Sequence, residues 1–280
     1  MAAILTASVG ILAYFRLIPG SELFLYEGRA SGTFKDANVF GPFLVPVALY
    51  LFSKLTGTPR RHIWRQLFLF LLIIFGILLS FSRGAWANLI ISMFIYILLR
   101  LVLRPSLAEV LRLGFLSGIV SLITVALVTW AIFTPELNEL FLERAKLLQT
   151  YDVEYGGRFS SLFVALDKSF EYPLGVGPGL SSSILSTEAH DLYIQVLIET
   201  GWLGLISFST FIIYSLVRSI RFCFSRPEVG DSYIVIVASF IGLLLESLVI
   251  HNIHWRHLYL LLAMLWGPML YYTKMKTTKI

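Results

Sequence analysis

Apolar runs alternate with short polar segments along the whole chain. A bilayer core about 30 Å thick requires about 20 apolar residues in a helix that rises about 1.5 Å per residue. Eight runs come close to this length, namely 1–18, 37–53, 66–82, 84–103, 112–133, 190–218, 233–250 and 257–273. The pattern predicts an all-α polytopic membrane protein, in which these helices form a single integral-membrane domain over residues 1–280.

Three of these runs contain features that shape the expected helices. Segment 66–103 is almost uninterrupted, and as one helix it would be about 57 Å long, which is too long for one crossing. We expect it to fold back at Ser82-Arg83-Gly84, with Gly84 supplying the backbone angles of a tight hairpin. Pro42 and Pro46 would kink the second helix, which is tolerated where neighbouring helices satisfy the freed carbonyl groups.

The longest polar segment, residues 134–189, lies between the fifth and sixth predicted helices. Residues 136–149 are expected to form an amphipathic helix on the membrane surface, and the remainder is rich in Gly, Ser and Pro. The run PLGVGPG at 173–179 lacks the preceding strand and the Lys-Ser/Thr pair of a nucleotide-binding loop. We interpret it as a mobile, turn-rich loop whose backbone N–H groups could cradle a phosphate.

Composition supports a membrane location. The chain is 57% hydrophobic and 14% charged, so it lacks the polar residues that would cover a soluble domain of this length. A single cysteine, Cys223, excludes an internal disulfide. The net charge of +5 does not indicate a nucleic-acid partner, because the basic residues are scattered between the apolar runs.

The basic residues orient the chain in the membrane. Thirteen Lys and Arg follow the second, fourth, sixth and eighth predicted helices, and five lie in the short loops on the opposite side. Cytoplasmic loops carry the excess of basic residues. We therefore expect a multi-pass inner-membrane protein with both termini in the cytoplasm and the 134–189 loop on the periplasmic or external side.

Three residues on the expected outer side could carry chemistry. Arg83 lies in a poorly solvated hairpin, where it could bind an anion or anchor a helix end by snorkelling. Arg158 follows two glycines in the long loop, and its planar guanidinium suits a phosphate, although a solvated loop arginine is the simpler interpretation. His190 begins the sixth run, and a neutral imidazole is a natural general base for a sugar hydroxyl.

Two glycines follow His190 in the same run. Gly201 and Gly204 lie eleven and fourteen residues further on, so all three residues would share one face of a continuous helix. The glycines would let another helix pack closely beneath the histidine, or their common face is a coincidence.

Residues near the seventh and eighth helices offer weaker candidates. His251, His254 and His257 are spaced by three, but no carboxylate lies nearby in sequence to complete a metal shell, so we expect neither a metal nor a cofactor. Glu246 lies near the outer end of the seventh run. It could be functional or could form an ion pair with Arg256 or Arg83.

Four stretches occur in order between residues 32 and 204. They are GTFKDAN at 32–38, FSRGA at 81–85, Gly157-Arg158 followed by PLGVG at 173–177, and His190-Asp191 followed nine residues later by GWLG at 201–204. Together they resemble the O-antigen ligase and O-antigen polymerase superfamily of membrane glycosyltransferases. The last stretch is similar to the ligase motif of His, a small polar residue, nine residues and a Gly-x-x-Gly-like end.

The resemblance implies a substrate and a role for each residue. The donor would be a glycan on undecaprenyl diphosphate, with Arg83 and Arg158 holding the diphosphate and His190 activating the acceptor hydroxyl. Asn38 and Asp191 would contribute to substrate binding. Transfer would invert the anomeric centre without a metal or nucleotide, and the arginines would stabilise the charge that develops on the lipid diphosphate.

Several alternatives stay open. Asp191 replaces the Asn, Ser or Gln usual in that family, and it could raise the basicity of His190 or cap the helix. Family members typically have more helices, so the chain resembles one that lacks several N-terminal helices. The acceptor could be lipid A–core, another lipid-linked repeat unit, or a protein Ser or Thr. A small-solute transporter, similar to relatives linked to bicarbonate, would need polar residues at the centres of several helices, and a structural membrane subunit is a third possibility.

Overall fold

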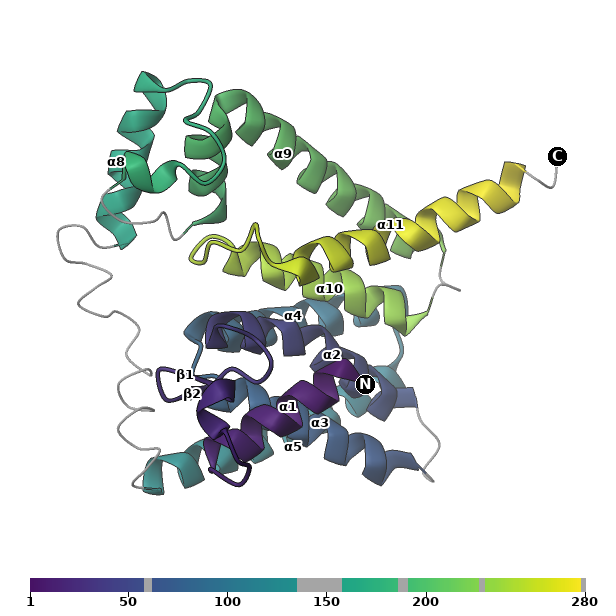
Figure 1. Cartoon of the computed structure of the whole chain (residues 1–280). Helices are drawn as coiled ribbons and strands as arrows, with labels where there is room; N and C mark the ends of the chain where they lie inside the picture. Colours follow the sequence, from purple (N-terminus) through teal and green to yellow (C-terminus); the bar gives the residue numbers. More distant parts are fainter. Residues whose placement is uncertain (58–61, 135–157, 186–190, 227–229, 278–280) are drawn as a thin grey trace. The chain divides into compact units, whose positions relative to one another are not determined.

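The computed structural model describes residues 1–57, 62–134, 158–185, 191–226 and 230–277 (Figure 1). Over these residues the fold is all-helical apart from a short hairpin, which confirms the predicted class. The helices are α1 (Ala2–Tyr14), α2 (Ala37–Gly57), α3 (Ile63–Leu79), α4 (Arg83–Leu103), α5 (Leu107–Phe133), α8 (Arg158–Glu171), α9 (Leu192–Ser225), α10 (Asp231–Glu246) and α11 (Arg256–Thr277). The hairpin pairs β1 (Leu25–Tyr26) with β2 (Arg29–Ala30) in antiparallel register, and single 3-10 turns cover Ser21–Phe24 and Ser181–Ser183.

Each of the eight apolar runs coincides with one helix, and among the described helices α8 alone lies outside them. Among the described residues, four helical segments are long and apolar enough to cross a membrane: Ala37–Thr56, Arg83–Leu103, Leu107–Trp130 and Leu192–Ser225. The apolar helices α1 and α3 are shorter, with 13 and 17 residues. Several long apolar helices in one chain are typical of a multi-pass membrane protein.

The chain forms two compact units. The first contains residues 1–145 and 223–242, and the second contains residues 146–222 and 243–280. The boundaries pass through α9 and α10, so each of these helices contributes to both units.

Helix α2 forms the centre of the first unit, where it packs against α3 and α4. Its residues Phe40, Leu44 and Phe52 are fully buried, and the Phe52 ring meets those of Phe70 and Tyr96 at centroid distances of 6.2 and 6.0 Å. The helix continues through both of its prolines. Burial of these apolar and aromatic side chains fixes α2 within the unit.

The turn between α3 and α4 occurs where the sequence predicted it, but through a different residue. The hydroxyl of Ser82 caps α4 by accepting a hydrogen bond from the Ala85 N–H at 3.3 Å. Gly84 is the second residue of α4 and has no left-handed backbone, so its predicted role in the turn is wrong. Phe81 supplies the left-handed angle instead (φ 47°), because its ring is buried against Tyr14.

The long loop contains a helix that the sequence did not predict. Residues 136–149, the expected surface helix, lie outside the described residues, whereas residues 158–171 form α8. Ala165 on α8 is buried in a small apolar cluster with Leu185 and with Ile198 of α9. This contact ties α8 to the first part of α9.

Candidate functional site

Helix α9 is broken at Gly201, and a loop is docked on the break. Gly201 has φ 70° and ψ −172°, which divides α9 into residues 192–200 and 202–225. Three backbone hydrogen bonds join the 173–179 loop to this point. The Val176 N–H donates to the Ile198 carbonyl (2.9 Å), the Gly177 N–H to the Glu199 carbonyl (3.0 Å), and the Trp202 N–H to the Pro173 carbonyl (3.0 Å).

These bonds contradict the proposed phosphate cradle in the 173–179 loop. The N–H groups of Val176 and Gly177 are bonded to α9, and the Gly175 N–H donates to the Tyr172 carbonyl at 2.9 Å. The Gly179 N–H donates to the Glu199 carboxylate at 2.8 Å. A phosphate would have to compete with bonds that already satisfy these donors, so the cradle prediction is wrong.

The glycines of the Gly-x-x-Gly end pack closely, but not against another helix. A Cβ atom on Gly201 would overlap the carbonyl oxygen of Pro173, and one on Gly204 would overlap the side chain of Thr200. Facing Gly201, Gly175 has φ 81°, and a Cβ there would lie 2.5 Å from the Glu199 carbonyl oxygen. The predicted shared face on a continuous helix is wrong, because the left-handed backbone at Gly201 interrupts the helical period.

Asp191 caps the first segment of α9. Its Oδ1 atom accepts hydrogen bonds from the N–H groups of Tyr193 (2.7 Å) and Ile194 (3.0 Å). Burial raises the pKa of the Asp191 carboxyl, while these two bonds act to lower it. Capping, one of the two roles left open from the sequence, is therefore confirmed. His190 lies outside the described residues, so an effect of Asp191 on it stays a prediction.

The turn between α10 and α11 braces the start of α9. The Leu192 N–H donates to the Ser247 carbonyl at 2.9 Å, and the buried Asn252 amide donates to the Ser247 hydroxyl at 2.7 Å. The rings of His251 and His254, in the same turn, meet at a centroid distance of 5.1 Å. The structure therefore brings two of the predicted histidines to the end of the second unit where α9 begins.

Asn38 and Arg83 belong to one corner of the first unit. Asn38 is the second residue of α2, and Arg83 is the half-buried first residue of α4. One turn after Asn38, Gly41 faces the α3–α4 turn so closely that a Cβ atom would lie 2.6 Å from Ala85 Cβ and 2.8 Å from Ser80 Oγ. Close packing at Gly41 thus holds the two helix starts together.

Three of the predicted site residues lie at the N-terminal ends of helices. Arg83 and Arg158 are the first residues of α4 and α8, and Asp191 is the cap of α9. Arg158 and Asp191 belong to the second unit, whereas Arg83 belongs to the first. The N-terminal end of a helix carries a partial positive charge, so each of these positions favours a nearby anion.

Two buried charges near these positions were missed from the sequence. Arg29 is 3% exposed, and its guanidinium donates to Asn38 Oδ1 and to Glu27 Oε2, both at 3.3 Å. Glu199 is 6% exposed and lies inside the sixth apolar run. An acid within an apolar run is a functional candidate, and the rule that selected Glu246 would have found Glu199 as well.

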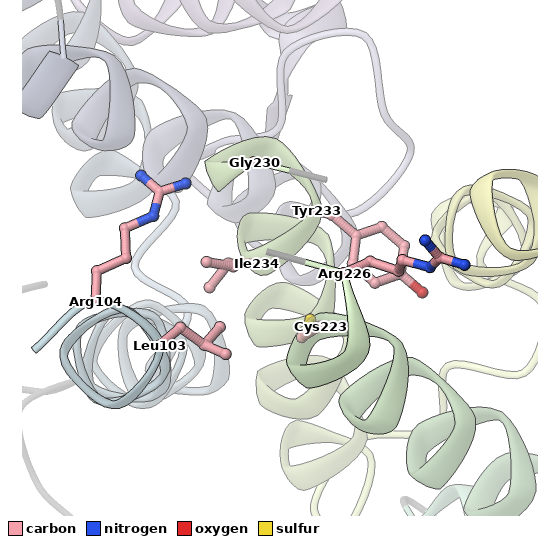
Figure 2. A pocket seen from close by; sticks show the side chains of 7 residues that line it. All are labelled: Leu103, Arg104, Cys223, Arg226, Gly230, Tyr233 and Ile234. Carbon is pink, nitrogen blue, oxygen red and sulfur yellow. The ribbon is translucent and has the colours of Figure 1, made fainter. Parts of the chain in front are cut away.

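Near the C-terminal end of α4, a buried arginine is surrounded by hydrogen-bond acceptors. Arg100 is 3% exposed, and its guanidinium donates to Asp231 of α10 (2.6 Å), Thr56 of α2 (2.9 Å) and Tyr96 (2.8 Å), with Glu109 of α5 at 3.3 Å. From the sequence, Arg100 counts only as one of the thirteen basic residues that orient the chain. A shallow pocket lies at this end (Figure 2). It is lined by Leu103, Arg104, Cys223, Arg226, Gly230, Tyr233 and Ile234, and it contains none of the predicted site residues.

The comparison with known families gives a match to part of the chain. The sequence model of the O-antigen ligase family matches residues 68–209, just over half of the chain. The matched segment runs from α3 into α9 and includes Arg83, Arg158 and His190, while Asn38 precedes it. No curated protein and no solved structure matches the chain significantly. With more than half of its length matched, from α3 through the broken helix α9, this multi-pass membrane protein belongs to the O-antigen ligase family, which is a family of enzymes.

Proposed function

We propose that the protein transfers a glycan from an undecaprenyl-diphosphate donor to an acceptor hydroxyl at the outer face of the inner membrane. The observation that carries the proposal is the family match over residues 68–209, which contains all three residues proposed to act on the donor and acceptor. The family implies lipid-linked glycan substrates. The donor, the inverting course and the independence from metals are parts of the proposal.

The arginines are proposed to bind the diphosphate. Arg83 and Arg158 each begin a helix, so the partial positive charge of the helix end adds to the charge of the guanidinium. An arginine can also donate two parallel hydrogen bonds to phosphate oxygens. Both effects grow as negative charge develops on the leaving diphosphate, which is what transition-state stabilisation requires.

His190 is proposed to act as the general base. The imidazole takes the proton of the acceptor hydroxyl while its oxygen forms a bond to the anomeric carbon of the donor. The bond from that carbon to the diphosphate oxygen breaks, and the lipid diphosphate leaves with the electron pair. Attack from the face opposite the leaving group inverts the anomeric centre. Asp191 holds the start of the helix that follows His190.

The membrane orientation supports an outward-facing site. We propose eight membrane-spanning helices with both termini in the cytoplasm, as the distribution of basic residues indicates. This orientation puts Arg83, Arg158 and His190 outside, where the activated donor must arrive already linked to a lipid. Lipid A–core is the proposed acceptor, because the matched family is that of the ligases. A second lipid-linked repeat unit and a protein hydroxyl are the alternatives.

The test is transfer by the purified protein in liposomes that contain the lipid-linked glycan and lipid A–core. Arg83→Ala and Arg158→Ala should each abolish transfer, and Arg→Lys should restore it only in part, because lysine binds a diphosphate as a point charge. Arg112→Ala, an exposed arginine of α5, is the matched control and should transfer normally. Wild-type transfer by either alanine variant would show that the arginine only anchors a helix end.

The role of His190 needs a separate measurement. His190→Gln should bind the donor normally and accumulate it, while transfer falls by about 10²- to 10⁴-fold, the usual contribution of a positioned base. A glutamine can hydrogen-bond the acceptor but cannot take its proton. A fully active His190→Gln variant would remove the base from the mechanism.

A further inference from the structure

Glu199 holds the docked loop through two separate groups. Its carboxylate Oε1 accepts hydrogen bonds from the Gly179 N–H at 2.8 Å and from the Gln195 side-chain amide at 2.6 Å. Its main-chain carbonyl accepts the Gly177 N–H at 3.0 Å. A carboxylate buried to this extent is unfavourable unless its oxygens are bonded, so its bonds to the loop explain its presence in an apolar run.

Gln195 completes the arrangement from one turn earlier on α9. Its amide nitrogen donates to the Ser181 hydroxyl at 2.7 Å as well as to Glu199. The amide is 3% exposed, and its oxygen has no hydrogen-bond partner among the described residues. Because a buried acceptor without a partner is unfavourable, the residue is best explained by the two bonds that its nitrogen makes. Gly179, Ser181, Gln195 and Glu199 together form a latch between the loop and α9.

The latch lies between the two parts of the second unit that carry candidate site residues. On one side, the loop follows directly after α8, which begins at Arg158. On the other side, Gln195 donates its N–H to the Asp191 carbonyl at 3.0 Å in the first turn of α9. The latch therefore fixes the segment that follows Arg158 relative to the helix segment that follows His190.

We infer that Glu199 is a positioning residue, which aligns the proposed diphosphate-binding helix α8 with the proposed base by holding the 173–181 loop on α9. The inference rests on the proposed function. Glu199 acts through hydrogen bonds and not through proton transfer, since both donors to Oε1 are amide N–H groups. A misalignment of about 1 Å between reacting groups can slow a reaction about 10²-fold while the substrate still binds.

The experiment compares Glu199→Ala, Glu199→Gln and wild type in two measurements. The first is hydrogen exchange of the amides at 175–181, which needs no substrate. The second is transfer kinetics with lipid-linked glycan, reported as kcat and donor Kd. Glu171→Ala, an exposed carboxylate of α8 paired with Lys168, is the matched control and should behave as wild type in both.

Glu199→Ala should speed exchange of the Gly177 and Gly179 amides at least tenfold and lower kcat by about 10- to 100-fold, with donor Kd within about threefold of wild type. Glu199→Gln should recover most of both, because its amide oxygen can accept the same two bonds. Gln195→Leu, which keeps the volume and loses both donor bonds, should behave like Glu199→Ala and replaces it if that variant fails to fold.

Three results would overturn the inference. They are unchanged kcat in Glu199→Ala, lowered kcat with unchanged loop exchange, and a Glu199→Gln variant that is inactive although its loop stays protected. The last result would show that the charge itself is required. A wild-type protein that transferred no lipid-linked glycan would instead refute the proposed function, and the exchange measurement would still report whether Glu199 holds the loop.

Discussion

Replacing Gly201 with alanine tests whether the break in α9 holds the docked loop. The backbone of Gly201, with φ 70° and ψ −172°, lies in a region that essentially only glycine populates. The added Cβ atom would overlap the Pro173 carbonyl oxygen and would lie 2.7 Å from the Gly175 nitrogen. Neither of these atoms can turn away, because both belong to the backbone of the loop.

The size of the effect follows from the bonds that would have to yield. Three backbone bonds and the Gly179–Glu199 bond join the loop to α9, and at about 1 kcal/mol each they contribute about 4 kcal/mol. The backbone strain of alanine at this position is about 1–3 kcal/mol. Strain alone would therefore raise the population of the undocked loop by about 5- to 150-fold, and the steric overlap adds to this.

Hydrogen exchange followed by mass spectrometry measures this population directly. Peptides that cover 173–181 should exchange at least about fivefold faster, the lower limit set by the backbone strain. Peptides of the buried helix α2 should keep their protection. Gly118→Ala on α5 is the control, because a Cβ at Gly118 meets no atom within 4 Å. Unchanged protection of the Val176 and Gly177 amides in Gly201→Ala would refute the reasoning, since an intact loop cannot accommodate the extra atom.

Three further predictions concern capping, the buried arginine and topology. Asp191→Ala should lose the cap of α9 and lower stability by about 1 kcal/mol, whereas Asp191→Asn keeps the cap. If Asp191 also acts on the base, Asp191→Asn should shift the acid limb of the pH–rate profile to lower pH, because removing an anion lowers a histidine's pKa; an unchanged profile would limit Asp191 to capping. Arg100→Leu removes the cation that Asp231 and Glu109 share, and it should lower the stability measured by thermal unfolding by about 3 kcal/mol. The double variant Arg100→Leu/Asp231→Asn should recover part of the lost stability. Because Cys223 is buried, a cysteine introduced at Glu143 should react with an impermeant reagent from outside with little background, and labelling only from the cytoplasmic side would reverse the proposed orientation.

The helices were predictable because hydrophobicity is a local signal summed over many residues. Each run of about 20 apolar residues coincides with a helix, and the turn ends at Ser82, the first residue of the predicted Ser-Arg-Gly break. The residue that makes the turn was not predictable in the same way. Phe81 adopts a left-handed backbone because its ring is buried against Tyr14, a contact with a residue 67 positions away that sequence spacing cannot reveal.

The family was predictable from the sequence, but the local geometry around the candidate residues was not. The order of Arg83, Arg158 and His190 resembled a family, and the comparison confirms that family. The break at Gly201 was missed because the glycine stands in an apolar run that looks like one uninterrupted helix. The loop that stabilises the break precedes it by more than twenty residues, so the bonds of Val176 and Gly177 to α9 could be found only in the fold.

Under the proposed orientation, the break in α9 would also set the depth at which the chemistry occurs. Residues 202–225 alone form a helix of about 36 Å, which is enough to cross a hydrocarbon core of about 30 Å. If residues 202–225 make the crossing by themselves, the nine residues before the break, about 13 Å of helix, would lie in the headgroup layer. An acceptor arriving from water would meet a lipid diphosphate at that level without entering the hydrocarbon. The proposal then predicts that activity depends on bilayer thickness, since a thicker membrane would submerge the first turn of α9.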